Sequence, residues 1–177
     1  MKNDKKIRSI VMTSALTALI CVATMLIQIP VPVTGGYVNL GDGFIVAGTF
    51  MLGMPYAAIA GALGSALADL LTGYAIYVPG TFIIKGLMAV AAFYCCKAVI
   101  KVNPNAKLAG RAAGAFAAEF VMTVGYFCYS IILLGGNVSG AFLTIPGNLV
   151  QGIFGVISGV IMSTAVAKTG VLSKITK

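Results

Sequence analysis

Long apolar stretches separated by short polar breaks fill this chain and predict a bundle of membrane-spanning helices. The breaks contain proline and glycine, as at Pro30, Pro32, Pro55 and Pro104. Because proline disfavours helical backbone at the preceding residue, helices are expected to end near these positions. The apolar segments between the breaks are predicted to be helices over residues 8–29, 42–53, 56–71, 80–100, 109–134 and 144–167.

The lengths of these segments suit a polytopic membrane protein. A hydrocarbon core of about 30 Å requires about 20 helical residues for each crossing, so 177 residues accommodate six crossings with short loops. Segment 42–53 is too short to cross alone, unless the bilayer is thin there or neighbouring helices shield it. We therefore predict an all-α fold, with residues 1–177 forming one integral membrane domain of six transmembrane helices.

Composition and charge agree with this fold and suggest its orientation. Hydrophobic residues make up 59% of the chain and charged residues only 9%. The basic residues cluster at 2–8, 97–111 and 168–177, and the positive-inside rule places such clusters in the cytoplasm. Six crossings put all three clusters on that side, whereas five would put the tail outside. The positive-inside bias in the cell membrane thus explains the net charge of +8, and we expect no nucleic-acid partner.

Small residues recur every four positions in segment 56–71 and predict close helix packing. One row consists of Ala57, Gly61, Ser65 and Asp69, and the adjacent row consists of Ala60, Gly64 and Ala68.

Charged residues between the basic clusters are the first candidates for a functional site. Each costs roughly 2.5–3.5 kcal/mol at mid-membrane, so each needs a partner, a cavity or a route to the interface. Glu119 begins a polar stripe that includes Tyr126, but it is equally compatible with a structural pair or an inert protonated acid. Lys85 could snorkel outward, pair with Asp69 or face a ligand. Asp42 could cap the helix that follows it.

Amides and aromatic residues supply the other candidates. Asn148 and Gln151 lie three residues apart on one helix face, where they could read a ligand or bond neighbouring helices. The loop tyrosines could stack on a planar ligand or form an interfacial belt. The predicted substrate-binding residues are Tyr37, Asn39, Asp69, Tyr74, Lys85, Glu119, Tyr126, Asn148 and Gln151.

Several chemistries are excluded by missing residues. The sequence has no G-x-x-x-x-G-K-[ST] loop, no G-x-S-x-G elbow and no histidine. Its four cysteines show no C-x-x-C spacing. We expect a protein without enzyme activity, cofactor or metal site. An alternative to a binding subunit is a self-contained ion-coupled carrier with Glu119 as its proton site, although no inverted repeat of the usual kind is visible.

Five segments together resemble the substrate-binding S components of energy-coupling factor (ECF) vitamin transporters. They are G-Y-V-N-L-G-D at 36–42, G-S-A-L-A-D at 64–69, G-Y at 73–74, T-F-I-I-K-G at 81–86 and I-P-G-N-L-V-Q-G at 145–152. The resemblance is strongest to the riboflavin branch, with the pyridoxine and hydroxymethylpyrimidine carriers nearby.

This resemblance implies a monomeric bundle that binds a vitamin at its outer end, under the loop between the first two helices. It also implies docking on a transmembrane T subunit carried by two cytoplasmic ATPases. Family members often dock through an A-x-x-x-A motif in the first helix. Here Ser14 and Ala18 take those positions, with Thr13 and Thr17 beside them, so these four residues form the expected docking face.

Overall fold

The computed structural model describes residues 2–31 and 36–169, and these residues form a bundle of helices with one small hairpin. The predicted basic tail beyond residue 169 and the loop residues 32–35 lie outside the described part. The elements are α1 (Lys2–Leu26), β1 (Gln28–Val31), β2 (Gly36–Asn39), α2 (Asp42–Leu52), α3 (Tyr56–Leu71), η1 (Ala75–Tyr77), α4 (Val78–Val102), α5 (Lys107–Leu133), α6 (Val138–Phe142) and α7 (Ile145–Lys168).

Four segments in the described chain are long and apolar enough to cross a membrane: Lys6–Leu26, Ala75–Val102, Lys107–Leu133 and Val138–Lys168. The bundle exposes large apolar side chains on its outside. Phe116, Phe120 and Ile153 are 66%, 70% and 60% exposed, for example, which suits lipid contact better than water. The prediction of a helical membrane protein is therefore confirmed.

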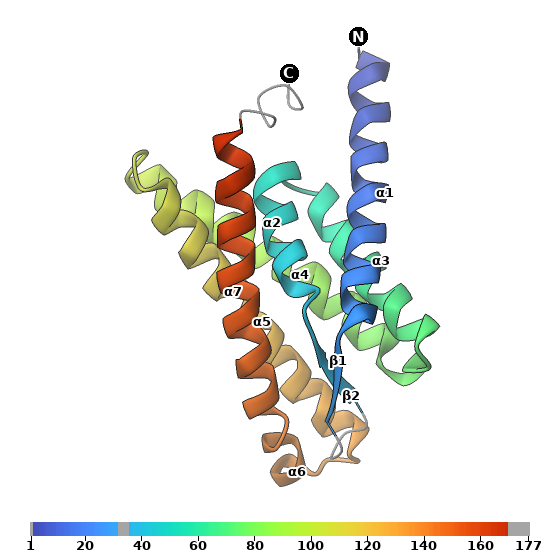
Figure 1. The fold of residues 1–177 in the computed structure, drawn as a ribbon. Helices are drawn as coiled ribbons and strands as arrows, with labels where there is room; N and C mark the ends of the chain where they lie inside the picture. Colours follow the sequence, from blue (N-terminus) through green and yellow to red (C-terminus); the bar gives the residue numbers. More distant parts are fainter. Residues whose placement is uncertain (1, 32–35, 170–177) are drawn as a thin grey trace.

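The short helix α2 lies in the middle of the bundle, between α1 and α7 (Figure 1). Most of its side chains are buried, including Ile45, Val46 and Thr49. Val46 joins the core cluster of Ile84 and Met122, which come from α4 and α5. Protein surrounds this helix on most sides, so its 11 residues are largely shielded from lipid.

The hairpin formed by β1 and β2 was not predicted. The sequence pattern extends the first helix to Ile29, but α1 ends at Leu26 and residues 28–31 pair antiparallel with residues 36–39. Pro30 explains the difference, because proline biases the residue before it to extended backbone. Gln28 lies opposite Asn39, and this register brings β2 back over the bundle.

The two ends of the bundle differ in what they carry. Figure 1 shows the start of α1, the link between α4 and α5, and the end of α7 at one end. The hairpin and α6 lie at the opposite end. All basic residues of the described part except Lys85 belong to segments at the first end. This arrangement places the hairpin end away from the positive charge.

The small-residue rows of α3 are buried, as predicted. A Cβ atom built on Gly64 would stand 2.6 Å from the carbonyl oxygen of Thr17 and 3.0 Å from the Cβ of Ile20. Since a backbone atom of α1 cannot rotate away, α1 and α3 pack this closely only because residue 64 has no side chain. By contrast, a Cβ on Gly86 of α4 would make ordinary contacts, at 3.6 Å from Ala62 and 3.9 Å from the carbonyl oxygen of Ala58.

Replacing Gly64 with alanine should push α1 away from α3 and destabilise the bundle by about 1–3 kcal/mol, which is typical of overpacking. The matched Gly86→Ala variant should melt at or above the wild-type temperature, because alanine favours helix and meets no close neighbour. Thermal unfolding in detergent, followed by circular dichroism, measures both variants. Equal melting temperatures for the two would contradict the proposed close contact.

Candidate functional site

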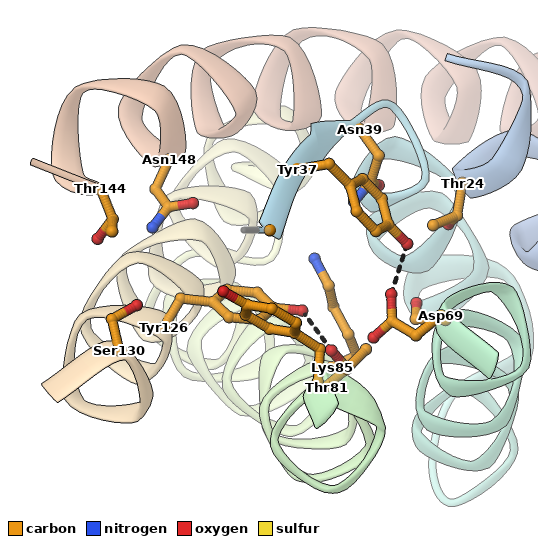
Figure 2. A pocket seen from close by; sticks show the side chains of 13 residues that line it. Thr24, Tyr37, Asn39, Asp69, Thr81, Lys85, Tyr126, Ser130, Thr144 and Asn148 are labelled. Carbon is orange, nitrogen blue, oxygen red and sulfur yellow. Dashed lines mark hydrogen bonds between the residues drawn. The ribbon is translucent and has the colours of Figure 1, made fainter. Parts of the chain in front are cut away.

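A polar cavity lies at the hairpin end of the bundle, where seven elements and the residues beside them converge (Figure 2). Residues from the end of α1, β2, the second half of α3, η1, the first half of α4, the end of α5 and the start of α7 contribute to it. The lining residues are Thr24, Gly36, Tyr37, Asn39, Ser65, Asp69, Tyr77, Thr81, Lys85, Tyr126, Ser130, Thr144 and Asn148.

Tyr37 covers one side of the cavity and is held by Asp69. The phenolic hydroxyl of Tyr37 donates a hydrogen bond of 2.5 Å to Oδ1 of Asp69 (Figure 2). The Tyr74 ring packs on Tyr37 from outside the lining, with 4.6 Å between ring centroids. The other oxygen of Asp69, Oδ2, is buried and has no hydrogen bond among the described residues. It is therefore available to a ligand donor in the cavity.

Ionisation of Tyr37 is disfavoured by its surroundings. Burial of the hairpin residue raises its pKa, and the nearby Asp69 carboxylate raises it further. The phenol therefore remains neutral and keeps its proton for the bond to Asp69.

A second pair of groups forms the wall opposite the hairpin. The hydroxyl groups of Tyr126 and Thr81 lie 3.0 Å apart, which joins α5 to α4. The ammonium group of Lys85 lies 5.3 Å from the centroid of the Tyr126 ring. The aromatic face is thus polarised by a cation that is itself buried, since Lys85 is only 1% exposed.

The floor of the cavity is a chain of buried polar groups that starts at Lys85. The Lys85 ammonium donates to Oδ1 of Asp42 in a buried ion pair. The other oxygen of Asp42 accepts a 2.5 Å hydrogen bond from Nε2 of Gln151. Oε1 of Gln151 in turn accepts from the backbone N–H of Asn39, at 2.8 Å. This chain connects α4, α2 and α7 to the last residue of the hairpin.

These contacts correct two readings of the sequence. Lys85 neither snorkels to the interface nor pairs with Asp69; it pairs with Asp42 and also lines the cavity. Asp42 makes no capping hydrogen bond at the start of α2, because its two oxygens are engaged by Lys85 and Gln151. Asp42, in the first turn of α2, thereby links α2 to α4 and α7.

Glu119 lies outside the cavity. Its side chain packs against the glycine face of α7, where Gly152 and Gly155 leave room for it beside Asp42. Both carboxyl oxygens are buried without a hydrogen bond among the described residues. Glu119 contributes instead to an apolar groove between α5 and α7.

Six of the nine predicted binding residues line the cavity: Tyr37, Asn39, Asp69, Lys85, Tyr126 and Asn148. Tyr74, Glu119 and Gln151 do not. Tyr74 supports Tyr37 from behind, and Gln151 belongs to the floor. The pattern did not single out Thr24, Ser65, Thr81 or Thr144, since small hydroxyl residues are frequent in membrane helices. These residues share burial at the hairpin end of the bundle, which is visible only in the fold.

The cavity is small in this conformation. Its volume is about 40 Å³, which is space for about one water-sized group, whereas sites for small organic ligands usually measure about 300–1,000 Å³. Tyr37 and Tyr77 both line this space, and a Cβ on Gly36 would stand 2.9 Å from the Tyr77 ring. A larger guest therefore requires lining side chains to move.

The predicted docking residues line a different depression. Thr13, Ser14, Thr17 and Ala18 face an apolar groove of about 600 Å³ between α1 and α3. Leu63 and Leu67 form part of its other wall. This groove is separate from the polar cavity, and the two share no lining residue.

The cavity lining combines hydroxyl, amide and charged groups with aromatic rings. No group of three or more potential metal ligands occurs among the described residues.

Comparison with known proteins places the chain in a family. A relative from Pyrococcus woesei, described as an uncharacterized protein in gap 3'region, is 34% identical over 140 residues, which cover 79% of this chain and 88% of that protein. The family model described as ECF-type riboflavin transporter, S component, matches residues 4–168. Since this match spans nearly the whole chain, the protein belongs to the ECF-type riboflavin transporter S-component family and is a transporter subunit, not an enzyme.

Proposed function

We propose that this protein captures a small water-soluble vitamin or vitamin precursor in the polar cavity under the hairpin. Riboflavin, pyridoxine and hydroxymethylpyrimidine are the candidate ligands. The observation that carries the proposal is the convergence of Asp69, Lys85 and Asn148 from three helices on one cavity beside the tyrosine rings. Burial of polar groups costs free energy unless they form hydrogen bonds, and a bound ligand can supply such bonds to the lining of the cavity.

The lining favours a planar ligand with hydrogen-bond donors at its edge. The aromatic rings of Tyr37, Tyr77 and Tyr126 offer stacking faces, and Oδ2 of Asp69 offers a free acceptor. Entry of a ring requires the hairpin to move outward and Tyr37 to release Asp69. Return of the hairpin would then cover the ligand.

We further propose six membrane crossings, with both termini and the basic loop 97–111 in the cytoplasm. The hairpin end then faces the outside, where the vitamin is scarce and must be captured. The partners are a transmembrane T subunit and two cytoplasmic ATPase subunits, because this chain has no ATP-binding loop of its own. The groove bordered by Thr13, Ser14, Thr17 and Ala18 is the proposed face for the T subunit.

Direct binding to the purified protein tests this function. Riboflavin, pyridoxine and hydroxymethylpyrimidine are each titrated by isothermal calorimetry, and one of them should bind at one site per chain. Failure of every water-soluble vitamin to bind would refute the proposal. Uptake into proteoliposomes without ATPase subunits would favour the ion-coupled carrier instead.

Asp69 provides a sharper test of the cavity. Asp69→Asn keeps the shape of the side chain but removes the charge that strengthens a ligand's hydrogen bond. Loss of a charged hydrogen bond of about 1.5–3 kcal/mol lowers vitamin affinity about 10- to 150-fold. The control is Tyr37→Phe, which removes the covering hydrogen bond at Oδ1 but leaves the carboxylate in place. Equal affinities for wild type and Asp69→Asn would remove Asp69 from the binding site.

A further inference from the structure

A second cavity lies at the basic end of the bundle, far from the proposed vitamin site along the helices. It is open to the surface, has a volume of about 430 Å³ and is bordered by the end of α2, the end of α4 and the start of α5. Lys97, Lys107 and Arg111 contribute its charged groups. Phe50, Phe93 and Ile100 contribute apolar surface to the same cavity.

The positive charge of this cavity is not balanced by the described part of the chain. No carboxylate is among the residues that line the cavity, and the three carboxylates whose side chains the structure describes, Asp42, Asp69 and Glu119, are buried elsewhere. Arg111 uses one of its donors on Oγ1 of Thr164, at 3.2 Å, which leaves most of the guanidinium free. Three cations with no described anion beside them favour an anionic ligand.

The apolar wall determines which anion fits. The Lys97 ammonium lies 5.8 Å from the Phe93 ring, so charged and apolar surfaces meet directly. A free phosphate would leave that apolar surface exposed, whereas a phospholipid would cover it with its glycerol and the start of an acyl chain. The segments that cross the membrane end at this level, where lipid headgroups lie.

We propose that this cavity is a binding site for an anionic phospholipid of the bilayer. Lys97, Lys107 and Arg111 hold its phosphate, and Phe50, Phe93 and Ile100 hold the adjoining apolar part. This site is independent of the vitamin-binding cavity. Basic pockets between helices are suited to such headgroups, and each cation near the surface adds to the attraction.

The test uses the full-length protein, delipidated in neutral detergent, and native mass spectrometry. Dioleoylphosphatidylglycerol is the probe, and dioleoylphosphatidylcholine and glycerol 3-phosphate are the comparisons. After the probe is added, we expect one phosphatidylglycerol to bind per chain. Phosphatidylcholine and glycerol 3-phosphate should bind at least about 10-fold more weakly. Equal retention of the two lipids would overturn the proposal, and so would glycerol 3-phosphate that competes as well as the lipid.

A pair of double variants locates the site. Lys97→Gln with Arg111→Gln should lower phosphatidylglycerol affinity about 30-fold, the effect of two surface cations. The control, Lys101→Gln with Lys168→Gln, removes the same charge from exposed residues outside the cavity and should change affinity less than about 3-fold. Equal losses in the two double variants would mean that net charge, not this cavity, attracts the lipid. The comparison of lipids uses the wild-type protein, so it tests the proposal even where a variant fails to fold.

Discussion

Replacing Lys85 with methionine should lower the stability of the bundle by about 3–5 kcal/mol, the usual effect of removing one partner from a buried ion pair. Lys85 and Asp42 are each 1% exposed, so solvent cannot compensate the carboxylate left behind. In this variant Asp42 would keep the hydrogen bond that it accepts from Gln151. Unfolding in mixed micelles with increasing sodium dodecyl sulfate measures the free energy.

A double variant separates the effect of the uncompensated Asp42 charge from the effect of lost packing around Lys85. Adding Asp42→Asn to Lys85→Met removes the uncompensated charge and should restore most of the lost stability, since a neutral pair often substitutes well for a buried ion pair. Lys101→Met is the matched surface control, because Lys101 is exposed at the end of α4. A Lys85→Met protein that unfolds together with the Lys101→Met control would contradict the structural role of the pair.

Periodicity and proline positions were sufficient to predict most helices. The apolar run of 56–71 predicts the bounds of α3, and those of α4, α5 and α7 differ from the predicted ones by only a few residues. These helices are bounded by residues such as Pro55 and Pro104, whose backbone effects are local. Helix formation in an apolar segment depends chiefly on neighbouring residues, so it can be read from a single chain.

The hairpin and the ion pair could not be predicted in the same way. Lys85 and Asp42 are separated by 43 positions, and their contact depends on how α2 lies against α4. Pairing of residues 28–31 with residues 36–39 likewise competes with continuation of α1. Sequence alone identified buried charges as candidates, but only the packing assigns Lys85 to Asp42 and leaves Glu119 between α5 and α7.

Buried hydrogen bonds connect the floor of the cavity to the hairpin. Asn39 ends β2, and its backbone N–H bonds to Gln151, which also bonds to Asp42. Asn39 also accepts a hydrogen bond from the backbone N–H of Gly41 through its Oδ1 atom, at 2.9 Å. The base of the hairpin is thus fixed by several buried bonds, and nearer its tip Tyr37 bonds to Asp69.

Filling the cavity should abolish vitamin binding while the protein stays folded. Ser130 is buried at the end of α5 and lines the cavity beside Thr144 and Asn148 (Figure 2). The added carbon atoms of Ser130→Leu would occupy the space of about 40 Å³ and block the ligand, so affinity should fall about 100-fold or more. Calorimetric titration with the vitamin that binds the wild-type protein measures the loss of affinity.

Two controls separate the blocked cavity from other effects of the substitution. Cys128→Leu places the same side chain on an exposed position of α5 and should leave affinity unchanged. Ser130→Ala removes the hydroxyl but leaves the space, so it should bind within about 10-fold of wild type, the loss of one ordinary hydrogen bond. Leucine is larger than serine and brings apolar surface against polar lining groups, so Ser130→Leu should melt somewhat below the wild type, and circular dichroism shows whether it is still folded. Full vitamin affinity in a folded Ser130→Leu protein would mean that the ligand binds somewhere else.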